Sequence, residues 1–290
     1  MLLFDLPKTE QEAILFLQER NILPKEQKCS NGHNMKLYIS KRIFWKCNLR
    51  QCNQQIGIRK DNWFDGSKIS FCTALRFIYC WCEKLTSIKF CKKQLGLSDK
   101  TAIDWNNSMR ELCVLDMENN SIKKKIGGPG CIVEIDESLF IKRKNNSGRI
   151  LPEQWVLGGI CRETKDSFIV TIPNRNGSTI LTKIIENIED GTTIYSEKKS
   201  LNQSFQQAQI NHKYNFIDSE TPGQTIHTNT VKRMWGSVKW RNKNHRGTAR
   251  QHVESYISEF IWRQYNMKQN RDCFESILNC ISTNFPFKSN

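Results

Sequence analysis

The sequence lacks a long apolar run and an obvious secretory start. Its most apolar stretch, Phe71 to Cys82, has only twelve residues and contains Arg76, whereas a membrane-spanning helix needs about 20. Asp5 and Pro7 interrupt the apolar residues that open the chain, which argues against a signal peptide. We therefore expect an intracellular protein without a membrane partner.

Acidic residues are scarce relative to basic ones. The 290 residues include 44 Lys and Arg against 29 Asp and Glu, which gives a formal net charge of +15. Because contacts between basic side chains and phosphates supply most non-specific affinity for nucleic acids, this excess favours DNA as a partner. A basic surface without any partner is the open alternative.

Internal repeats and low-complexity tracts are also missing, and the length allows about two domains. Twelve cysteines are scattered through the chain, and in a chain of this size they suit reduced thiols and a metal site better than a disulfide framework. The run Gly127-Gly-Pro-Gly130 is the clearest linker, since neither helix nor strand tolerates it.

Hydrophobic periodicity divides the chain into five parts. Before the linker we expect a helix at 8–20 and a helical region from 70 to 118. Its first helix carries Leu75, Ile78, Tyr79 and Cys82 on one face, and two further helices follow at 86–95 and 99–116. After it we expect strands at 131–142, 154–162, 167–173 and 192–196, and helices at 177–189, 200–209, 229–241 and 249–266. The alternation predicts a mixed α/β sheet with flanking helices. The expected parts are an N-terminal helix (1–25), a zinc-ribbon-like module (26–65), a helix–turn–helix region (70–120), the α/β domain (128–270) and a C-terminal tail (271–290).

The first module contains a candidate zinc site. Cys29-x3-His33 and Cys47-x4-Cys52 are two closely spaced pairs separated by short β runs. Such spacing is typical of tetrahedral Zn²⁺ ligation, here by three cysteines and one histidine. The alternative is three buried free cysteines and a surface histidine.

The helical region contains a candidate DNA-binding motif. Leu95 closes one helix, Gly96 makes a turn, and Ser98 or Asp99 caps the next helix. In a helix–turn–helix the second helix enters the major groove of DNA. An ordinary helical hairpin without a DNA contact remains the alternative.

Three positions in the α/β domain outline a candidate catalytic site. Asp136 ends an alternating strand, Glu197 ends a second short strand, and position 232 falls on a helix. Two strand-end acids and one helix-borne acid are what a two-metal phosphoryl-transfer site requires, with Mg²⁺ or Mn²⁺ held by carboxylates. The third position, however, holds Lys232.

Basic residues flank these positions. Arg143, Lys144, Arg149, Lys239 and Arg241 are candidates for the wall of a DNA groove. A solvated basic loop is the alternative interpretation.

Residues 131–266 resemble the catalytic domain of Merlin-type DDE transposases, the eukaryotic relatives of a bacterial insertion-sequence family. The resemblance rests on short sequence motifs that occur in the same order as in that family. They are Glu134-Ile-Asp-Glu137, Arg143-Lys-x3-Gly148-Arg149, Gln154-Trp-Val-x-Gly158-Gly159, Gly191-Thr-Thr-Ile, Asn211-His212, Phe216-Ile-Asp218, His227-Thr-Asn229, Trp235-x3-Lys239 and Glu259-Phe-x-Trp262-Arg263. The resemblance implies a ribonuclease-H-like fold, cut-and-paste transposition at transposon terminal repeats, a homo-oligomer, and a nuclear location in a eukaryotic host.

The departures from that family concern the acids. Asp136 matches the first acid, but the second should be aspartate and is Glu197, whose extra methylene moves the carboxylate by about 1.5 Å. Functional groups in working sites are held within about 0.5 Å. Lys232 replaces the third acid, and neither Glu220 nor Glu254 lies at the family position. We therefore expect DNA strand cleavage and transfer to be impaired; the alternative is a domesticated, non-catalytic DNA-binding or regulatory protein, or a decaying copy.

Overall fold

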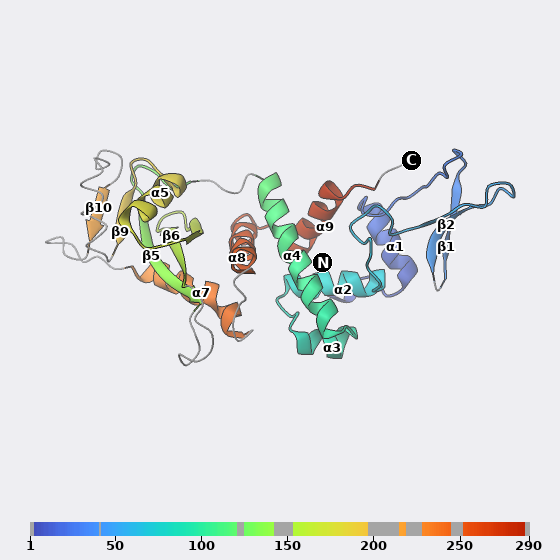
Figure 1. Ribbon diagram of the computed structural model, residues 1–290, viewed down its shortest axis with the longest axis horizontal. Helices are drawn as coiled ribbons and strands as arrows, with labels where there is room; N and C mark the ends of the chain where they lie inside the picture. The colour runs from blue at the N-terminus through green and yellow to red at the C-terminus, as the bar shows by residue number, and fades with distance from the viewer. Residues whose placement is uncertain are drawn as a thin grey trace. The chain divides into compact units, whose positions relative to one another are not determined.

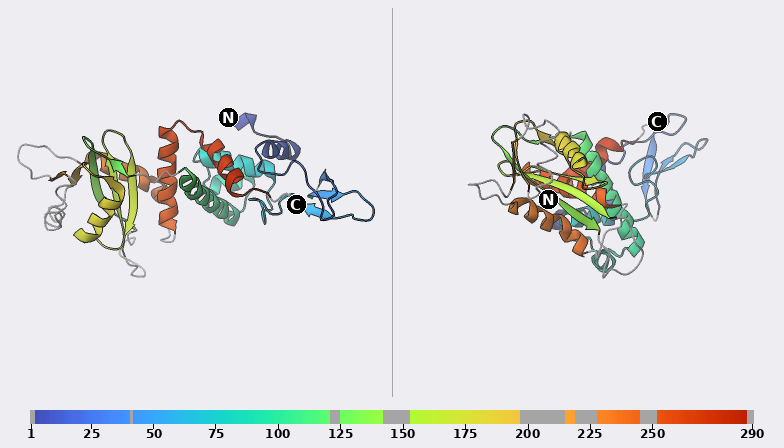
Figure 2. Two further views of the ribbon diagram at one scale, coloured as in Figure 1. Left: turned by 90° about the horizontal axis from the view of Figure 1, so that it is seen from above. Right: turned by 60° about the vertical axis from the view of Figure 1, so that its left-hand side comes forward.

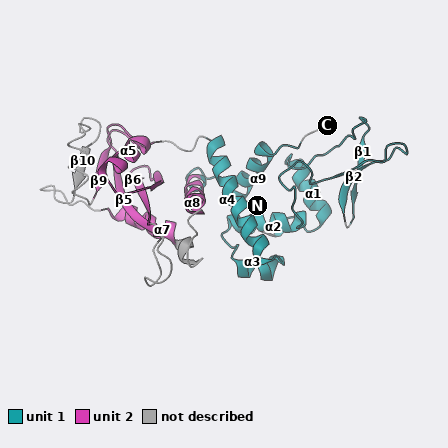
Figure 3. Cartoon of the chain, in the orientation of Figure 1, with its two compact units in different colours: residues 1–120, 266–290 teal, residues 121–265 magenta. Residues whose placement is uncertain are grey.

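The computed structural model describes residues 3–40, 42–120, 125–141, 153–196, 215–218, 228–244 and 252–287. The chain forms two compact units, Met1–Asn120 with Asn266–Asn290, and Ser121–Tyr265 (Figure 3). No helix among the described residues is both long enough and apolar enough to cross a bilayer.

The first unit combines a small sheet with a group of helices. Its elements are η1 (Leu3–Asp5), α1 (Glu10–Glu19), β1 (Met35–Ile39), β2 (Ile43–Cys47), β3 (Gln55–Gly57), α2 (Phe71–Cys82), α3 (Ile88–Leu95), α4 (Asp99–Asn119) and α9 (Cys273–Asn284). The sheet is antiparallel with β2 in the middle, and its register pairs Met35 with Cys47. The short β runs expected around the cysteines are therefore present.

Serine caps begin three of these helices, as their sequences suggest. The hydroxyls of Ser70, Ser87 and Ser98 each accept the backbone N–H three residues further on, at the starts of α2, α3 and α4. Such a cap satisfies one of the N–H groups that a helix start leaves without a partner. Gly96 ends α3 in the left-handed conformation, with φ of 65°, which favours glycine.

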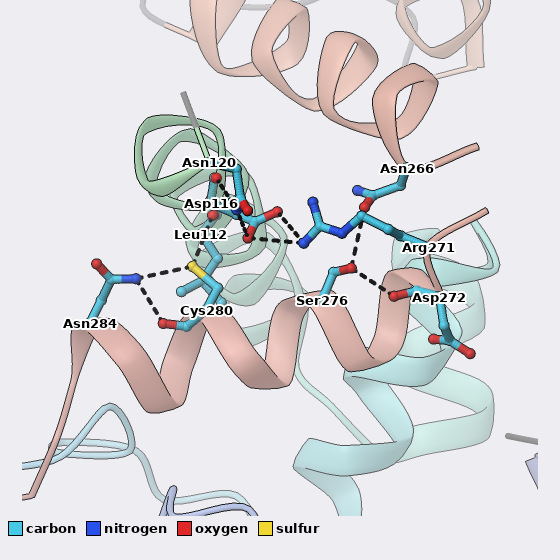
Figure 4. A network of polar contacts seen from close by, with 9 residues as sticks. All are labelled: Leu112, Asp116, Asn120, Asn266, Arg271, Asp272, Ser276, Cys280 and Asn284. Carbon is cyan, nitrogen blue, oxygen red and sulfur yellow. Dashed lines mark hydrogen bonds and ion pairs between the residues drawn. The ribbon is translucent and has the colours of Figure 1, made fainter. Parts of the chain in front are cut away.

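The end of the chain belongs to the first unit. Helix α9 packs against α4 and α2, and a network of polar contacts secures it (Figure 4). Arg271 lies 3.3 Å from the Asp116 carboxylate of α4, and the Cys280 thiol donates to the Leu112 carbonyl at 3.3 Å. Residues 271–290 were expected only as a tail, yet they contain a helix with a buried apolar face that includes Ile277.

The second unit is built on a five-stranded sheet. Its elements are β4 (Ile126–Gly127), β5 (Ile132–Ile141), β6 (Gln154–Cys161), β7 (Ser167–Ile172), α5 (Gly177–Asn187), β8 (Ile188–Glu189), β9 (Thr193–Ser196), β10 (Asn215–Asp218), α7 (Asn229–Asn244) and α8 (Val253–Lys268), whose last residues reach the first unit. The strand order is β10-β9-β5-β6-β7. Strand β5 pairs in parallel with β9 and antiparallel with β6.

Helices cover both faces of this sheet (Figure 1 and Figure 2). On one face Ile180 and Ile184 of α5 join the core with Val133 and Ile135 of β5. On the other face α7 and α8 pack on residues such as Val156 of β6. The mixed α/β class predicted from the sequence is confirmed, and the arrangement is similar to the ribonuclease-H-like fold that the resemblance implies.

The predicted linker is more ordered than its glycines suggest. Gly127 belongs to β4, which pairs in parallel with β8, and Gly128 donates its N–H to the Thr192 hydroxyl at 2.8 Å. The prediction of a strand-free run was therefore wrong at Gly127. A side chain at this position, with φ of 94°, would meet Thr192, so only glycine fits. The helix predicted at 200–209 lies outside the described residues.

Candidate functional site

Asp136 lies on β5, the middle strand of the larger sheet, and pairs with Gly158 of β6. Side chains alternate along a strand. Ile135 is in the core beneath α5, so Asp136 shares the opposite face, which α7 covers, with Glu134 and Ser138. The Asp136 side chain is half-buried. The strand thus presents an acid to the helix that carries position 232.

The pair Gly158-Gly159 allows α7 to approach closely. A methyl group on Gly158 would lie 2.7 Å from Cζ2 of Trp235 and 2.8 Å from Cε of Met234, both on α7. A methyl group on Gly159 would clash with Phe168 on the other face of the sheet. These glycines therefore determine how near the helix lies to the strand that bears Asp136.

Glu134 anchors the start of α7. Its carboxylate is fully buried and accepts the N–H groups of Thr230 at 2.8 Å and Val231 at 3.0 Å. Arg162 donates to it through Nε at 2.6 Å. The first turn of a helix has N–H groups without partners and a positive partial charge, and a carboxylate satisfies both. Glu134 therefore attaches α7 to the strand two residues before Asp136.

Arg162 extends this attachment to a third element. Its guanidinium lies 4.6 Å from the ring centroid of Tyr195, which pairs with Glu134 across β5 and β9. Strand β9 leads to position 197. We call Glu134, Arg162, Tyr195 and the first turn of α7 the Glu134 network; it joins the elements that lead to all three acid positions.

The sequence interpretation assigned no role to Glu134 or Arg162. The signal for Glu134 was an acid inside an apolar strand, since a buried carboxylate needs a partner. Its partner, Arg162, is 28 residues away, and only the strand pairing brings the two together.

Lys239 makes a second contact between α7 and β5. Its ammonium donates to the Ser138 hydroxyl and, at 3.3 Å, to the Leu139 carbonyl. From Glu134 to Ser138 the strand advances about 13 Å. From Val231 to Lys239 the helix advances about 12 Å. The helix therefore runs alongside β5 and in the same direction.

Lys232 lies between these two contacts, one residue after the first. It shares a flank of α7 with Lys239, seven residues on. Its side chain is exposed, whereas Val231, Met234, Trp235 and Val238 are buried. The helix thus brings position 232 to the β5 side of the sheet, where the sequence predicted a metal ligand, and supplies a lysine.

Several predicted site residues fall in segments that the structure does not describe. Glu197, Arg143, Lys144 and Arg149 lie outside the described residues, and of Arg241 only the backbone of α7 is described. Glu220, one possible substitute acid, also lies outside them.

The other possible substitute acid, Glu254, lies elsewhere. On α8 its carboxylate accepts from the Thr171 hydroxyl of β7 at 3.2 Å. Strand β7 is two strands from β5, or about 10 Å. Glu254 therefore does not supply the missing third acid.

The four predicted zinc ligands come together in the first unit. One ligand atom each from Cys29, His33, Cys47 and Cys52, which we call the Cys29 cluster, lies within 4.8 Å of the others. The Cys29 and Cys47 sulfurs lie 3.4 and 3.8 Å from Nδ1 of His33, and the Cys52 and Cys29 sulfurs are 3.6 Å apart. Bond lengths to tetrahedral Zn²⁺ imply edges of about 3.5–3.8 Å. The donor set and its spacing therefore fit zinc.

Cys29 has a favourable environment for a thiolate. Burial raises the pKa of its thiol, but the backbone N–H groups of His33 and Asn31 and the thiols of Cys52 and Cys47 lower it, to about 7 overall. The thiolate is the form that binds a metal.

Comparison with known proteins gives one informative match. Residues 128–265 match the family model of the ISXO2-like transposase domain, and this match supports a transposase family for the second unit. No curated protein matches the chain.

Solved structures resemble the chain only distantly. The intasome of simian T-cell lymphotropic virus in complex with a PP2A regulatory subunit has a TM-score of 0.33 and 14% identity, covering 62% of this chain and 67% of that one. The Mos1 strand transfer complex has a TM-score of 0.27 and 8% identity, covering 73% and 78%.

Proposed function

We propose that the chain is a transposase-like DNA-binding protein whose ancestral activity was metal-dependent DNA strand cleavage and transfer, and whose catalysis is impaired. The match of residues 128–265 to a transposase domain supports the ancestry. The position of Asp136 beside a helix that bears Lys232 supports the impairment.

Lys232 is the observation that carries this proposal. Helix α7 contacts β5 on both sides of residue 232, through the bonds of Glu134 to the first turn and of Lys239 to Ser138. Residue 232 therefore cannot simply be displaced. An ammonium group has three donors and no acceptor, so it cannot bind Mg²⁺ or Mn²⁺. Its positive charge also disfavours a cation nearby. Asp136 and Glu197 alone do not fit a two-metal site.

DNA binding is the activity that we expect to remain. Exposed lysines such as Lys93 and Lys100 lie on α3 and at the start of α4, where their charges can meet phosphates. We propose that α3, Gly96 and α4 act as a helix–turn–helix, with the start of α4 in the major groove. We further propose that the Cys29 cluster holds a structural Zn²⁺, which would fix the β1–β3 ribbon.

The remaining assignments stand as proposals from the Merlin-type resemblance. The DNA would be transposon terminal repeats, the assembly a homo-oligomer, and the location the nucleus of a eukaryotic host. Arg143, Lys144, Arg149, Lys239 and Arg241 would contact the DNA backbone. For Lys239 the contacts to Ser138 and Leu139 also indicate a structural role.

The decisive test restores both acids, with Glu197→Asp and Lys232→Glu in one chain. We expect no strand cleavage of terminal-repeat DNA by the wild type in Mg²⁺ or Mn²⁺, and cleavage by the restored protein. The matched control adds Asp136→Ala to the restored protein and should abolish cleavage. Nicking by the wild type that Asp136→Ala removes would overturn the proposed impairment. Lack of cleavage by a restored protein that binds DNA normally would contradict the assignment of these two positions.

A domesticated, non-catalytic regulator is favoured over a decaying copy by one observation. The contacts that hold the second unit together, at Glu134 and Gly158, involve none of the replaced acids. A cooperative thermal transition and DNA binding with a steep salt dependence would support domestication. A chain that purifies as an aggregate without bound zinc would support decay.

A further inference from the structure

A second group of thiols lies on the α5 face of the larger sheet, opposite Asp136. Cys161 ends β6 within the core beneath α5, and Cys131, just before β5, packs against that core. Glu163 follows in the turn after β6. One ligand atom from each of these three residues, the Cys131 cluster, lies within 4.8 Å of the others.

The backbone holds the three residues in place. Arg162 N–H donates to the Ile132 carbonyl at 2.8 Å, which joins the start of β5, next to Cys131, to the end of β6, and Thr193 N–H donates to the Cys131 carbonyl at 3.0 Å. Cys161 N–H donates to the Asp166 carbonyl at 2.8 Å, which closes the turn that contains Glu163. These bonds make the arrangement pre-formed, and a pre-formed site loses little conformational entropy when a ligand binds.

The Glu163 carboxylate lies next to the Cys161 thiol. Glu163 accepts the N–H of Ile132 through Oε2 at 2.9 Å, and the same oxygen lies 3.4 Å from the sulfur of Cys161. In a tetrahedral zinc site, bond lengths of about 2.3 Å to sulfur and about 2.0–2.2 Å to oxygen place these two atoms about 3.5 Å apart. The observed spacing is therefore close to that of two ligands of one ion.

We propose that Cys131, Cys161 and Glu163 form a second metal site, for Zn²⁺ or another thiophilic divalent ion, with water as the fourth ligand. Two sulfur donors select such ions over Mg²⁺ or Ca²⁺, which prefer oxygen alone. The ion would tie the start of β5 to the turn between β6 and β7. The site is independent of the Cys29 cluster and of DNA binding, because it shares no residue with either.

The test counts bound Co²⁺, a spectroscopic probe for zinc sites, on the reduced, metal-free full-length chain. Thiolate ligation gives a charge-transfer absorption band in the near ultraviolet. The wild type should bind two equivalents with such bands. The double variant Cys131→Ser with Cys161→Ser should bind one, and so should Cys47→Ser with Cys52→Ser. The control Cys273→Ser, a half-buried cysteine outside both clusters, should bind two.

A second variant keeps the test decisive if the cysteine pair is needed for folding. Glu163 is exposed, so Glu163→Gln should leave the circular dichroism spectrum unchanged while weakening the second Co²⁺ site roughly tenfold or more. One equivalent of Co²⁺ on the wild type that the double variant Cys131→Ser with Cys161→Ser still binds would overturn the proposal and leave two thiols that merely pack in the core. Unaltered affinity of Glu163→Gln would also overturn it.

Discussion

The Cys29 cluster brings four possible metal ligands together, whereas at the proposed Asp136 site the structure places one acid, Asp136, beside the helix that carries Lys232. The ribbon has a small sheet and few buried residues apart from Cys29 and Cys47, so an ion bound by the Cys29 cluster would also hold the ribbon together. Around Asp136 the Glu134 network and Gly158 hold the fold, and the acids are separate residues. We therefore expect that loss of an acid at the Asp136 site leaves the fold of the second unit intact. Loss of a ligand from the Cys29 cluster should also unfold the ribbon.

The largest effect should come from Cys47→Ser. Removing one of four ligands should release the zinc and unfold the ribbon, because the binding free energy of a structural zinc site is also folding free energy. Metal content and limited proteolysis between residues 26 and 65 measure this. Cys273→Ser is the matched control and should change neither. A zinc-free ribbon that still resists protease would contradict a structural role for the ion.

Glu134→Ala should have the next largest effect, on the second unit. It leaves the Arg162 guanidinium and two helix N–H groups without their buried partner, and breaking such a pair costs about 3–5 kcal/mol in free energy of unfolding. Urea denaturation followed by tryptophan fluorescence would measure the loss. Glu186→Ala, at an exposed pair with Lys183, should cost about 0–1 kcal/mol. Equal losses in the two variants would show that the Glu134 network does not stabilise the unit.

Gly158→Ala should destabilise the second unit by a smaller amount. The added methyl group meets Trp235 and Met234, and overpacking of this kind costs about 1–3 kcal/mol. Gly236 lies on α7 with Trp235 and Met234, and among the described residues no atom lies within 4 Å of the carbon that alanine would add there. Gly236→Ala should stabilise the protein by about 0.5–1 kcal/mol, because alanine favours a helix interior over glycine. Melting temperatures that shift in the same direction for both variants would contradict the close approach of α7.

The smallest effect on stability should come from Lys100→Ala on α4. Because Lys100 is exposed, its replacement should change the free energy of unfolding by less than about 0.5 kcal/mol. If α4 meets DNA phosphates, the slope of log affinity against log salt should fall by about one. Lys25→Ala, an exposed lysine outside the helical motif, should leave the slope unchanged. Identical slopes for both variants would show that Lys100 on α4 does not contact DNA phosphates.

Much of the second unit could be predicted from local pattern. Strands such as 154–161 and helices such as 177–187 follow from hydrophobic periodicity, and the structure places them within a few residues of their predicted ends. Helix α9, which packs against α4 and α2, was missed although Phe274, Ile277 and Ile281 recur at helical spacing. Strand β10 was also missed.

The sequence by itself determined three features of this protein: the four possible metal ligands, the mixed α/β pattern, and the lysine at position 232. These depend on residue identity and on spacing within short segments, so they can be read locally. Only the tertiary structure decided that Glu134 holds the start of α7, that α9 completes the first unit, and that Cys131, Cys161 and Glu163 share one corner of the sheet. The physical reason is that strand pairing and core packing join residues far apart in the chain, and no local pattern records which partners they choose.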